Sequence, residues 1–162
     1  MSPRAACRLE TLGFGVVYDY VPGKVDWLAH GLPFEGSNAG TPMAGASARV
    51  DIATAGLEEP IGNIRERVAL TPYGFALVTS PDGVLLGRLR QAALEGDPSA
   101  RAEAVMEAGP STVRPNAALE GLFERMGARR LTRAIVTSPE GKLLGVVGRA
   151  DTSSSPGPTP AG

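Results

Sequence analysis

"LVTSPDGVLLGRLR" (77–90) and "IVTSPEGKLLGVVG" (135–148) are two versions of one short sequence within a single chain. Residue 77 aligns with residue 135, and the same offset of 58 residues aligns the chain with itself, without a gap, from residue 54 to residue 90. Upstream of the quoted stretches, Ile61 falls on Leu119 and Ile64 falls on Leu122. Because chance rarely keeps both spacing and residue type over such a distance, the sequence predicts two copies of one structural unit.

Each copy begins with an extended segment, 49–54 in the first and 111–115 in the second, followed by apolar residues at helical spacing. Asn116 is a suitable N-cap for the second helix. The apolar stripe consists of Ile61, Ile64 and Val68 in the first copy and of Leu119, Leu122, Phe123 and Met126 in the second.

Two strands follow the helix of the first copy, 75–80 and 84–89, and Ser80-Pro81-Asp82-Gly83 joins them. Proline and glycine at these positions are typical of a type I turn that closes with a left-handed residue, and 138–141 repeats the pattern. "QAALEG" (91–96) predicts a short helix, and Asp97-Pro98 predicts the start of another.

One such unit is too small to be stable alone, because helices cover only one face of its three-stranded sheet. Two units packed face to face bury the remaining apolar faces. The predicted fold class is therefore α+β, with two β-α-β-β-α units related by a pseudo-two-fold axis.

Residues 105–151 resemble the cystathionine-β-synthase (CBS) motif. They contain a methionine near the start, a Thr-Val-x-Pro strand (112–115), an amphipathic helix, and "GKLLGVVGRAD" at the end. Residues 49–96 resemble a more diverged copy. In that family the motifs occur in tandem pairs, called Bateman modules. The resemblance implies a regulatory homodimer that binds an adenine nucleotide or a related ligand in the cleft between repeats.

The resemblance also implies ligand-binding positions. A Thr/Ser-x-x-Asp run after the last strand supplies a carboxylate that accepts hydrogen bonds from both ribose hydroxyls. Here the run is Gly148 to Asp151, which keeps the acid and lacks the hydroxyl, whereas the first copy has Arg90 to Ala93 and lacks both. The candidate ligand-binding residues are Asp151, Thr112, Val113, Pro115, Val136 and Arg149, with Arg90 and Arg114 as further candidates for phosphate contacts.

Each candidate has a structural alternative. Asp151 is equally well explained as a helix cap or as the start of the tail. Thr112 and Val113 are ordinary strand residues, and the arginines are typical of a solvated surface.

Residues 1–36 lie outside the repeat and resemble the closing third of a rhodanese domain. They predict a helix with an apolar stripe at Ala6, Leu9 and Leu12, a strand at 16–21, and a helix containing Trp27 that ends at 31–33, "GLP". A rhodanese needs a cysteine in the loop before that last helix, and Cys7 instead falls inside the first one. We therefore expect Cys7 to serve packing, the single histidine, His30, to be structural, and sulfurtransferase activity to be absent.

The remaining segments are a linker at 37–48, a second CBS motif with its connecting helix at 97–151, and a disordered tail at 152–162. The charges nearly cancel, with 16 basic and 17 acidic residues, which argues against nucleic-acid partners. Apolar runs are far shorter than the ~20 residues that span a bilayer, so no membrane partner is expected. One cysteine and one histidine make no metal site, and the single cysteine suits a cytoplasmic location.

We therefore interpret the chain as a non-enzymatic regulatory CBS pair with no cofactor other than an adenine-nucleotide ligand. Two alternatives stay open. One is an interaction or structural module whose cleft binds nothing, and the other is a truncated form of a rhodanese–CBS fusion sulfurtransferase.

Overall fold

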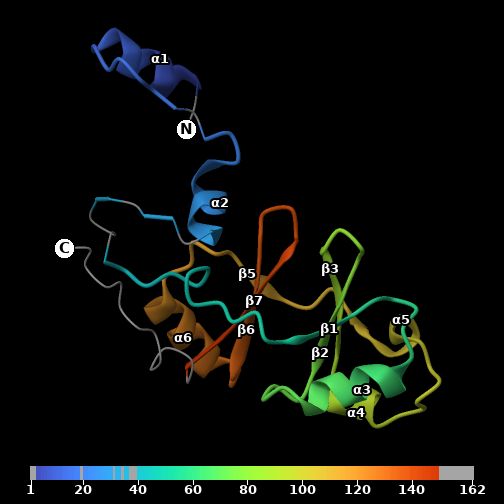
Figure 1. Cartoon of the computed structure of the whole chain (residues 1–162). Helices are drawn as coiled ribbons and strands as arrows, with labels where there is room; N and C mark the ends of the chain where they lie inside the picture. The colour runs from blue at the N-terminus through green and yellow to red at the C-terminus, as the bar shows by residue number, and fades with distance from the viewer. Residues whose placement is uncertain (1–2, 19, 31, 34, 37–39, 150–162) are drawn as a thin grey trace.

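The computed structural model describes residues 3–18, 20–30, 32–33, 35–36 and 40–149. They form two sheets, a four-stranded sheet in the order β1-β2-β3-β4 and a three-stranded sheet in the order β5-β6-β7 (Figure 1). The helices α3 and α4 cover the first sheet, and α6 lies against the second (Figure 1). Asp151 and the predicted tail at 152–162 lie outside the described residues.

The two repeats have the same order of elements. In both, the first strand runs parallel to the second, and the third is antiparallel to the second. The first repeat comprises β1 (Ala53–Ala55), α3 (Ile61–Ala69), β2 (Ala76–Thr79), β3 (Leu85–Leu89) and α4 (Gln91–Leu94). After it come α5 (Ala102–Val105) and β4 (Glu107–Ala108). The second repeat comprises β5 (Thr112–Val113), α6 (Leu119–Ala128), β6 (Arg133–Thr137) and β7 (Leu143–Gly148).

The predicted apolar faces of the two main helices and the two predicted hairpin turns are confirmed. The apolar stripes of α3 and α6 face the two cores, where Ile61 and Ile64 are fully buried and Leu122 is 3% exposed. Both hairpin turns end on a left-handed glycine, with φ of 80° at Gly83 and 83° at Gly141. These features depend on local spacing, which the sequence shows directly.

The repeats pack face to face around a pseudo-two-fold axis, as predicted. Equivalent residues exchange hydrogen bonds at the hairpin tips: the Leu85 amide donates to the Gly141 carbonyl at 3.0 Å, and the Leu143 amide donates to the Gly83 carbonyl at 2.9 Å. Behind the tips, a core shared by both repeats contains Ile52, Leu77, Ile135 and Val146. The shared core buries the apolar faces that a single repeat would expose.

The segment before each repeat packs onto the other repeat's elements. Ala44 is fully buried beside α6, and its amide donates to the Ala117 carbonyl at 2.8 Å. Arg49 exchanges two backbone hydrogen bonds with Val146 on β7. Residues 43–48, which lie within the range expected to be a linker, are therefore packed, because small side chains let the backbone approach the second repeat closely.

The amino-terminal segment contains the two predicted helices, α1 (Pro3–Thr11) and α2 (Gly23–Ala29). α1 lies apart from the repeats (Figure 1), and Cys7 is exposed, so the expected packing role of Cys7 is wrong. The predicted strand at 16–21 does not form among its described residues, and Tyr18 is 85% exposed. A strand without a pairing partner is not stable in water, which explains the difference.

Two predicted helix starts also differ. α6 begins after Ala118 without a side-chain cap, so Asn116 is not its N-cap. Asp97 instead caps a turn by accepting a hydrogen bond from the Ser99 amide at 2.9 Å, and α5 begins only after Arg101. No helix in the described part of the chain has the length and apolar character needed to cross a membrane.

Candidate ligand-binding cleft

A cavity of about 370 Å³ lies between the two repeats. The second repeat contributes β5, the inner face of α6 and the start of β6, and the first repeat's sheet contributes residues of β3 and β4. Apolar side chains form part of the wall. They include Val113, Leu122, Met126, Leu131 and Ile135.

The remaining wall of this cavity is strongly basic. Five arginines line it and a single glutamate opposes them, which leaves an excess of positive charge. The arginines are Arg88, Arg90, Arg125, Arg129 and Arg133, and the glutamate is Glu107. Arg133 also lies over the ring of Tyr73, with its guanidinium carbon 4.4 Å from the ring centroid.

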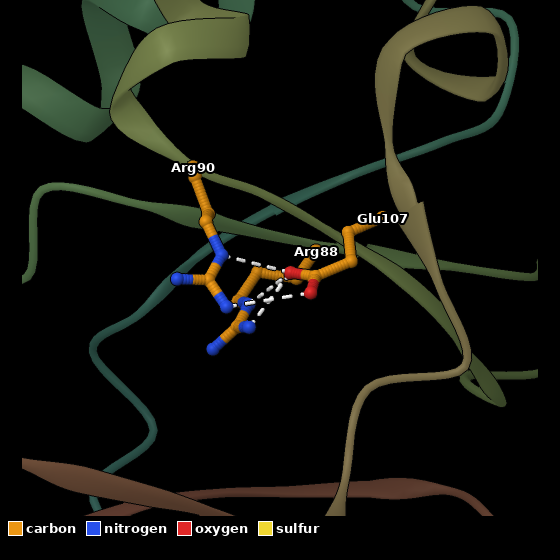
Figure 2. A network of polar contacts seen from close by, with 3 residues as sticks. All are labelled: Arg88, Arg90 and Glu107. Atoms are coloured by element: carbon orange, nitrogen blue, oxygen red, sulfur yellow. Dashed lines mark hydrogen bonds and ion pairs between the residues drawn. The ribbon is translucent and has the colours of Figure 1, made fainter. Parts of the chain in front are cut away.

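Glu107 is held between two of these arginines (Figure 2). Its Oε2 accepts hydrogen bonds from Arg88 Nη2 at 2.7 Å, Arg88 Nε at 3.1 Å and Arg90 Nε at 2.8 Å. Arg90 Nη2 donates to Oε1 at 3.3 Å. Arg88 lies on β3, and Arg90 follows the last residue of β3 in an extended conformation, so the two side chains share one face and converge on the same carboxylate.

These contacts shift the pKa values of charged groups in the cluster. The hydrogen bonds from Arg90 and then Arg88 lower the pKa of Glu107 from its usual 4.5 to about 2. The same contact with Glu107 raises the pKa of Arg90. The carboxylate therefore keeps its charge throughout the neutral and mildly acidic range.

The predicted ligand residues divide into two groups in the structure. Thr112 and Val113 line the cavity. Pro115 and Val136 are fully buried and contribute no open surface to it, and Ile135, next to Val136, forms the wall instead. Side chains alternate between the two faces of β6, so Ala134 and Val136 pack in the core of the second repeat, whereas Ile135 belongs to the core shared by both repeats.

The predicted phosphate-binding arginines also lie in different places. Arg90 lines the cavity, whereas the Arg114 guanidinium donates to the backbone carbonyl of Ser138. Arg149 is exposed, and its Nη1 lies 3.8 Å from the point that a Cβ on Gly127 would occupy, beside the end of α6. The role of Asp151 remains a prediction, since Asp151 lies outside the described residues.

Comparison with known proteins identifies the architecture. The sequence matches no family model and no curated protein. Among solved structures it is similar to the cytosolic domain of the Mg²⁺ channel MgtE in complex with ATP, with 22% identity and a TM-score of 0.61. The match covers 71% of this chain and 50% of that one, so this chain spans half the length of the channel domain.

Two further structures are similar over most of their own length. One is a CBS domain protein from Pyrobaculum aerophilum complexed with AMP (16% identity, 70% of this chain, 92% of that chain, TM-score 0.57). The other is a CBS domain pair in complex with 5′-methylthioadenosine and S-adenosyl-L-methionine (14% identity, 70% and 94%, TM-score 0.58). The fold is that of a CBS-domain pair.

The two CBS motifs present different chemistry at equivalent positions. At the offset of 58 residues, Leu131 and Arg133 of the cavity correspond to Tyr73 and Phe75 of the first motif. The Tyr73 hydroxyl donates to Asp51, and the rings of Tyr73 and Phe75 lie 6.2 Å apart. Aromatic side chains therefore occupy the first motif's counterparts of Leu131 and Arg133.

A wider depression of about 730 Å³ lies on the first motif, near the ends of β1 and β2. Two of its charged groups already pair with each other, since Arg67 contacts Glu59 at 2.5 Å, and Arg67 also donates to the Thr54 carbonyl at 2.7 Å. The pairing lowers the pKa of Glu59 and raises that of Arg67. This depression belongs to one motif, whereas residues of both motifs line the smaller cavity.

Sequence reasoning named Arg90 and missed the other charged residues of the cavity. The spacing of Arg125 and Arg129, four residues apart around the end of a helix, is a signal for a shared face. No sequence pattern indicates that Glu107 belongs to the cavity. Glu107 reaches the cavity because β4 pairs with β3, and these two strands are separated in the sequence. Among the described residues, no group of three or more His, Cys, Asp or Glu side chains is placed to hold a metal ion.

Proposed function

We propose that this chain is a regulatory module that binds one adenine nucleotide in the cavity between its two CBS motifs. The observation that carries the proposal is the cavity itself, in which apolar residues of the second motif lie beside arginines of both motifs. Its volume of about 370 Å³ falls within the range of about 300–1,000 Å³ that is usual for small-molecule sites.

Each part of a nucleotide has a matching part of the cavity. Val113 and Ile135 offer an apolar surface on which a base can pack. The arginines offer charged donors for phosphate oxygens. The resemblance to CBS motifs adds the carboxylate of Asp151 for the ribose. The proposal assigns no catalytic step to the chain.

Regulation would follow from the position of the cavity between the motifs. A ligand that touches both Arg90 and Thr112 binds best when the two motifs have one particular separation. It therefore shifts the population towards that arrangement, by no more than its difference in affinity for the two arrangements. Homodimer formation is a further part of the proposal, based on the family resemblance, and sedimentation analysis tests it.

Isothermal calorimetry with adenosine, AMP, ADP and ATP tests the nucleotide. Thr112→Trp fills the cavity, whereas Thr54→Trp introduces the same bulk at the equivalent exposed position of the first motif. We expect one nucleotide per chain, binding that is at least about tenfold weaker in Thr112→Trp, and unchanged binding in Thr54→Trp. Asp151→Ala should also weaken binding of all four ligands, because all four carry the ribose.

The alternative is a CBS pair that serves interaction alone. Gly148 and Ala93 favour it, because both motifs lack the hydroxyl and the first also lacks the acid. If none of the four ligands gives heat with the wild-type chain, the nucleotide proposal is wrong and the interaction module is the better interpretation. Weaker binding in Thr54→Trp alone would place the ligand on the first motif and also contradict the proposal.

A further inference from the structure

Two guanidinium groups and one carboxylate meet at the edge of the cavity, and their charges do not cancel. Arg88 and Arg90 carry two positive charges, and Glu107 supplies one negative charge. All three side chains reach solvent, with exposures of 25%, 63% and 49% respectively. The cluster therefore keeps a net positive charge at a position that a ligand can approach.

The hydrogen-bonding capacity of the cluster is also incompletely used. Oε2 of Glu107 accepts three of the four hydrogen bonds, and both guanidinium groups retain an Nη1 that Glu107 does not engage. Each guanidinium has five N–H donors in a planar fork. A phosphate group has three acceptor oxygens and carries up to two negative charges, so it matches this pair of arginines better than one carboxylate does.

The rest of the cavity strengthens the preference for a highly charged ligand. Arg125, Arg129 and Arg133 line it as well, so a ligand anchored at Arg88 and Arg90 meets further positive charge. At the equivalent position of the first motif, the offset of 58 residues replaces Glu107 by Arg49, which pairs with Asp51 at 2.8 Å. The first motif therefore has no counterpart of this carboxylate at the equivalent position.

We propose that Glu107 is an internal substitute for a phosphate group, and that a ligand with a chain of two or more phosphates displaces it from Arg88 and Arg90. This inference deepens the proposed nucleotide function, on which its biological meaning rests, by naming the part of the ligand that the site selects. It predicts that affinity rises with the number of phosphates and that Glu107 weakens binding by competing for the same donors.

The low pKa of Glu107 is consistent with this arrangement. Because the carboxylate stays ionised near neutral pH, protonation does not release the arginines there. Release requires another anion. The exposed position of the cluster makes the exchange sensitive to salt, since small ions screen contacts of this kind.

Calorimetry with ATP, adenosine and inorganic tripolyphosphate tests the inference on the full chain. The variants are Glu107→Gln, which removes the competing charge, and Arg90→Gln, which removes one donor group. The matched controls are Glu58→Gln and Arg101→Gln, whose side chains are 81% and 60% exposed and form a separate, looser pair at 3.8 Å. Unfolding midpoints confirm that each variant is folded.

We expect Glu107→Gln to bind ATP and tripolyphosphate about fivefold more tightly than the wild type, the scale of an exposed ion pair, and to bind adenosine unchanged. Arg90→Gln should bind both phosphate ligands about fivefold more weakly. Both controls should match the wild type. Unchanged or weaker phosphate binding in Glu107→Gln overturns the inference, because a competitor cannot be removed without a gain.

The three probes separate failure of this inference from failure of the proposed function. If tripolyphosphate binds and responds to Glu107→Gln while ATP binds no better than tripolyphosphate, the phosphate site stands and the nucleotide proposal fails. If ATP and adenosine bind but Glu107→Gln changes neither ATP nor tripolyphosphate binding, the nucleotide proposal stands and the role of Glu107 is wrong. Absence of binding by all three overturns both.

Discussion

Replacing Gly145 by alanine should destabilise the chain far more than the same change at its counterpart, Gly87. A Cβ at Gly145 would lie 2.4 Å from the Arg49 carbonyl oxygen and 3.0 Å from its carbonyl carbon. Backbone cannot move aside as a side chain can, and Arg49 is fixed there by hydrogen bonds of 2.8 and 2.9 Å with Val146. Gly145 also has φ of 142°, which an alanine adopts only with strain.

The magnitude follows from two costs. Backbone strain of this kind costs about 1–3 kcal/mol. Forcing an extra carbon into packed structure costs about 1–3 kcal/mol more. Gly145→Ala should therefore lose about 2–6 kcal/mol of unfolding free energy, a large share of the roughly 5–15 kcal/mol typical of a domain.

The same change at Gly87 meets a different obstacle. A Cβ there would meet only side-chain atoms of Met106, with the sulfur nearest and Cγ at 2.9 Å, and this flexible side chain can shift more easily than backbone can. We expect a loss of about 1 kcal/mol. Gly121→Ala, on α6 with no atom near the added carbon, is the control and should stabilise the chain by about 0.5–1 kcal/mol.

Urea unfolding followed by far-ultraviolet circular dichroism measures all three variants. If Gly145→Ala costs no more than Gly87→Ala, the backbone of Arg49 does not lie against β7. The packing of the segment before the first motif onto the second motif would then be wrong. The direct connection that this packing makes between the two sides of the cleft would be wrong as well.

Core burial gives a second prediction: Leu122→Ala should cost about 2–5 kcal/mol, whereas Leu70→Ala, 87% exposed, should change stability by less than about 0.5 kcal/mol, both measured by urea unfolding. Similar losses in the two variants would contradict the predicted core. A third concerns pH. The folded-state pKa values of Asp51 and Glu107 are both about 2, below their usual 3.8 and 4.5. Lowered values stabilise the fold above the unfolded-state pKa, so this small contribution should be complete above about pH 5 and lost towards pH 2. Unfolding midpoints across this range should show Glu107→Gln less stable than wild type near neutrality, with the difference gone near pH 2; a difference that grows in acid would contradict the assignment.

The helices and hairpins of this CBS pair could be predicted because their signals are local. The spacing of Ile61, Ile64 and Val68 identifies a buried helix face without knowledge of what covers it. The left-handed glycine at the end of each turn follows from four consecutive residues. The repeat then predicts the overall fold as well. Helices cover each sheet on one face only, so the two sheets must bury their other apolar faces against each other.

The packing of Ala44 could not be predicted in the same way. Its segment contains small and polar residues, which are also typical of linkers. What buries it is the close approach of a distant part of the chain, where Pro115 and the Leu28 carbonyl lie near Gly45. The packing requires a small side chain at such a contact. In the sequence alone, however, small residues are typical of a linker without regular structure.

The cleft shows the same limit, because its charged residues become a site only through pairing between segments. Arg88 and Arg90 share a face by strand alternation, but Glu107 reaches them only because β4 pairs with β3. The pseudo-symmetry places two equivalent positions in the backbone, and the side chains then make them unequal: arginines and a carboxylate at one, Tyr73 and Phe75 at the other. Binding of one anionic ligand per chain is the consequence that this difference predicts, since five arginines and one carboxylate line the cavity at the first of these positions.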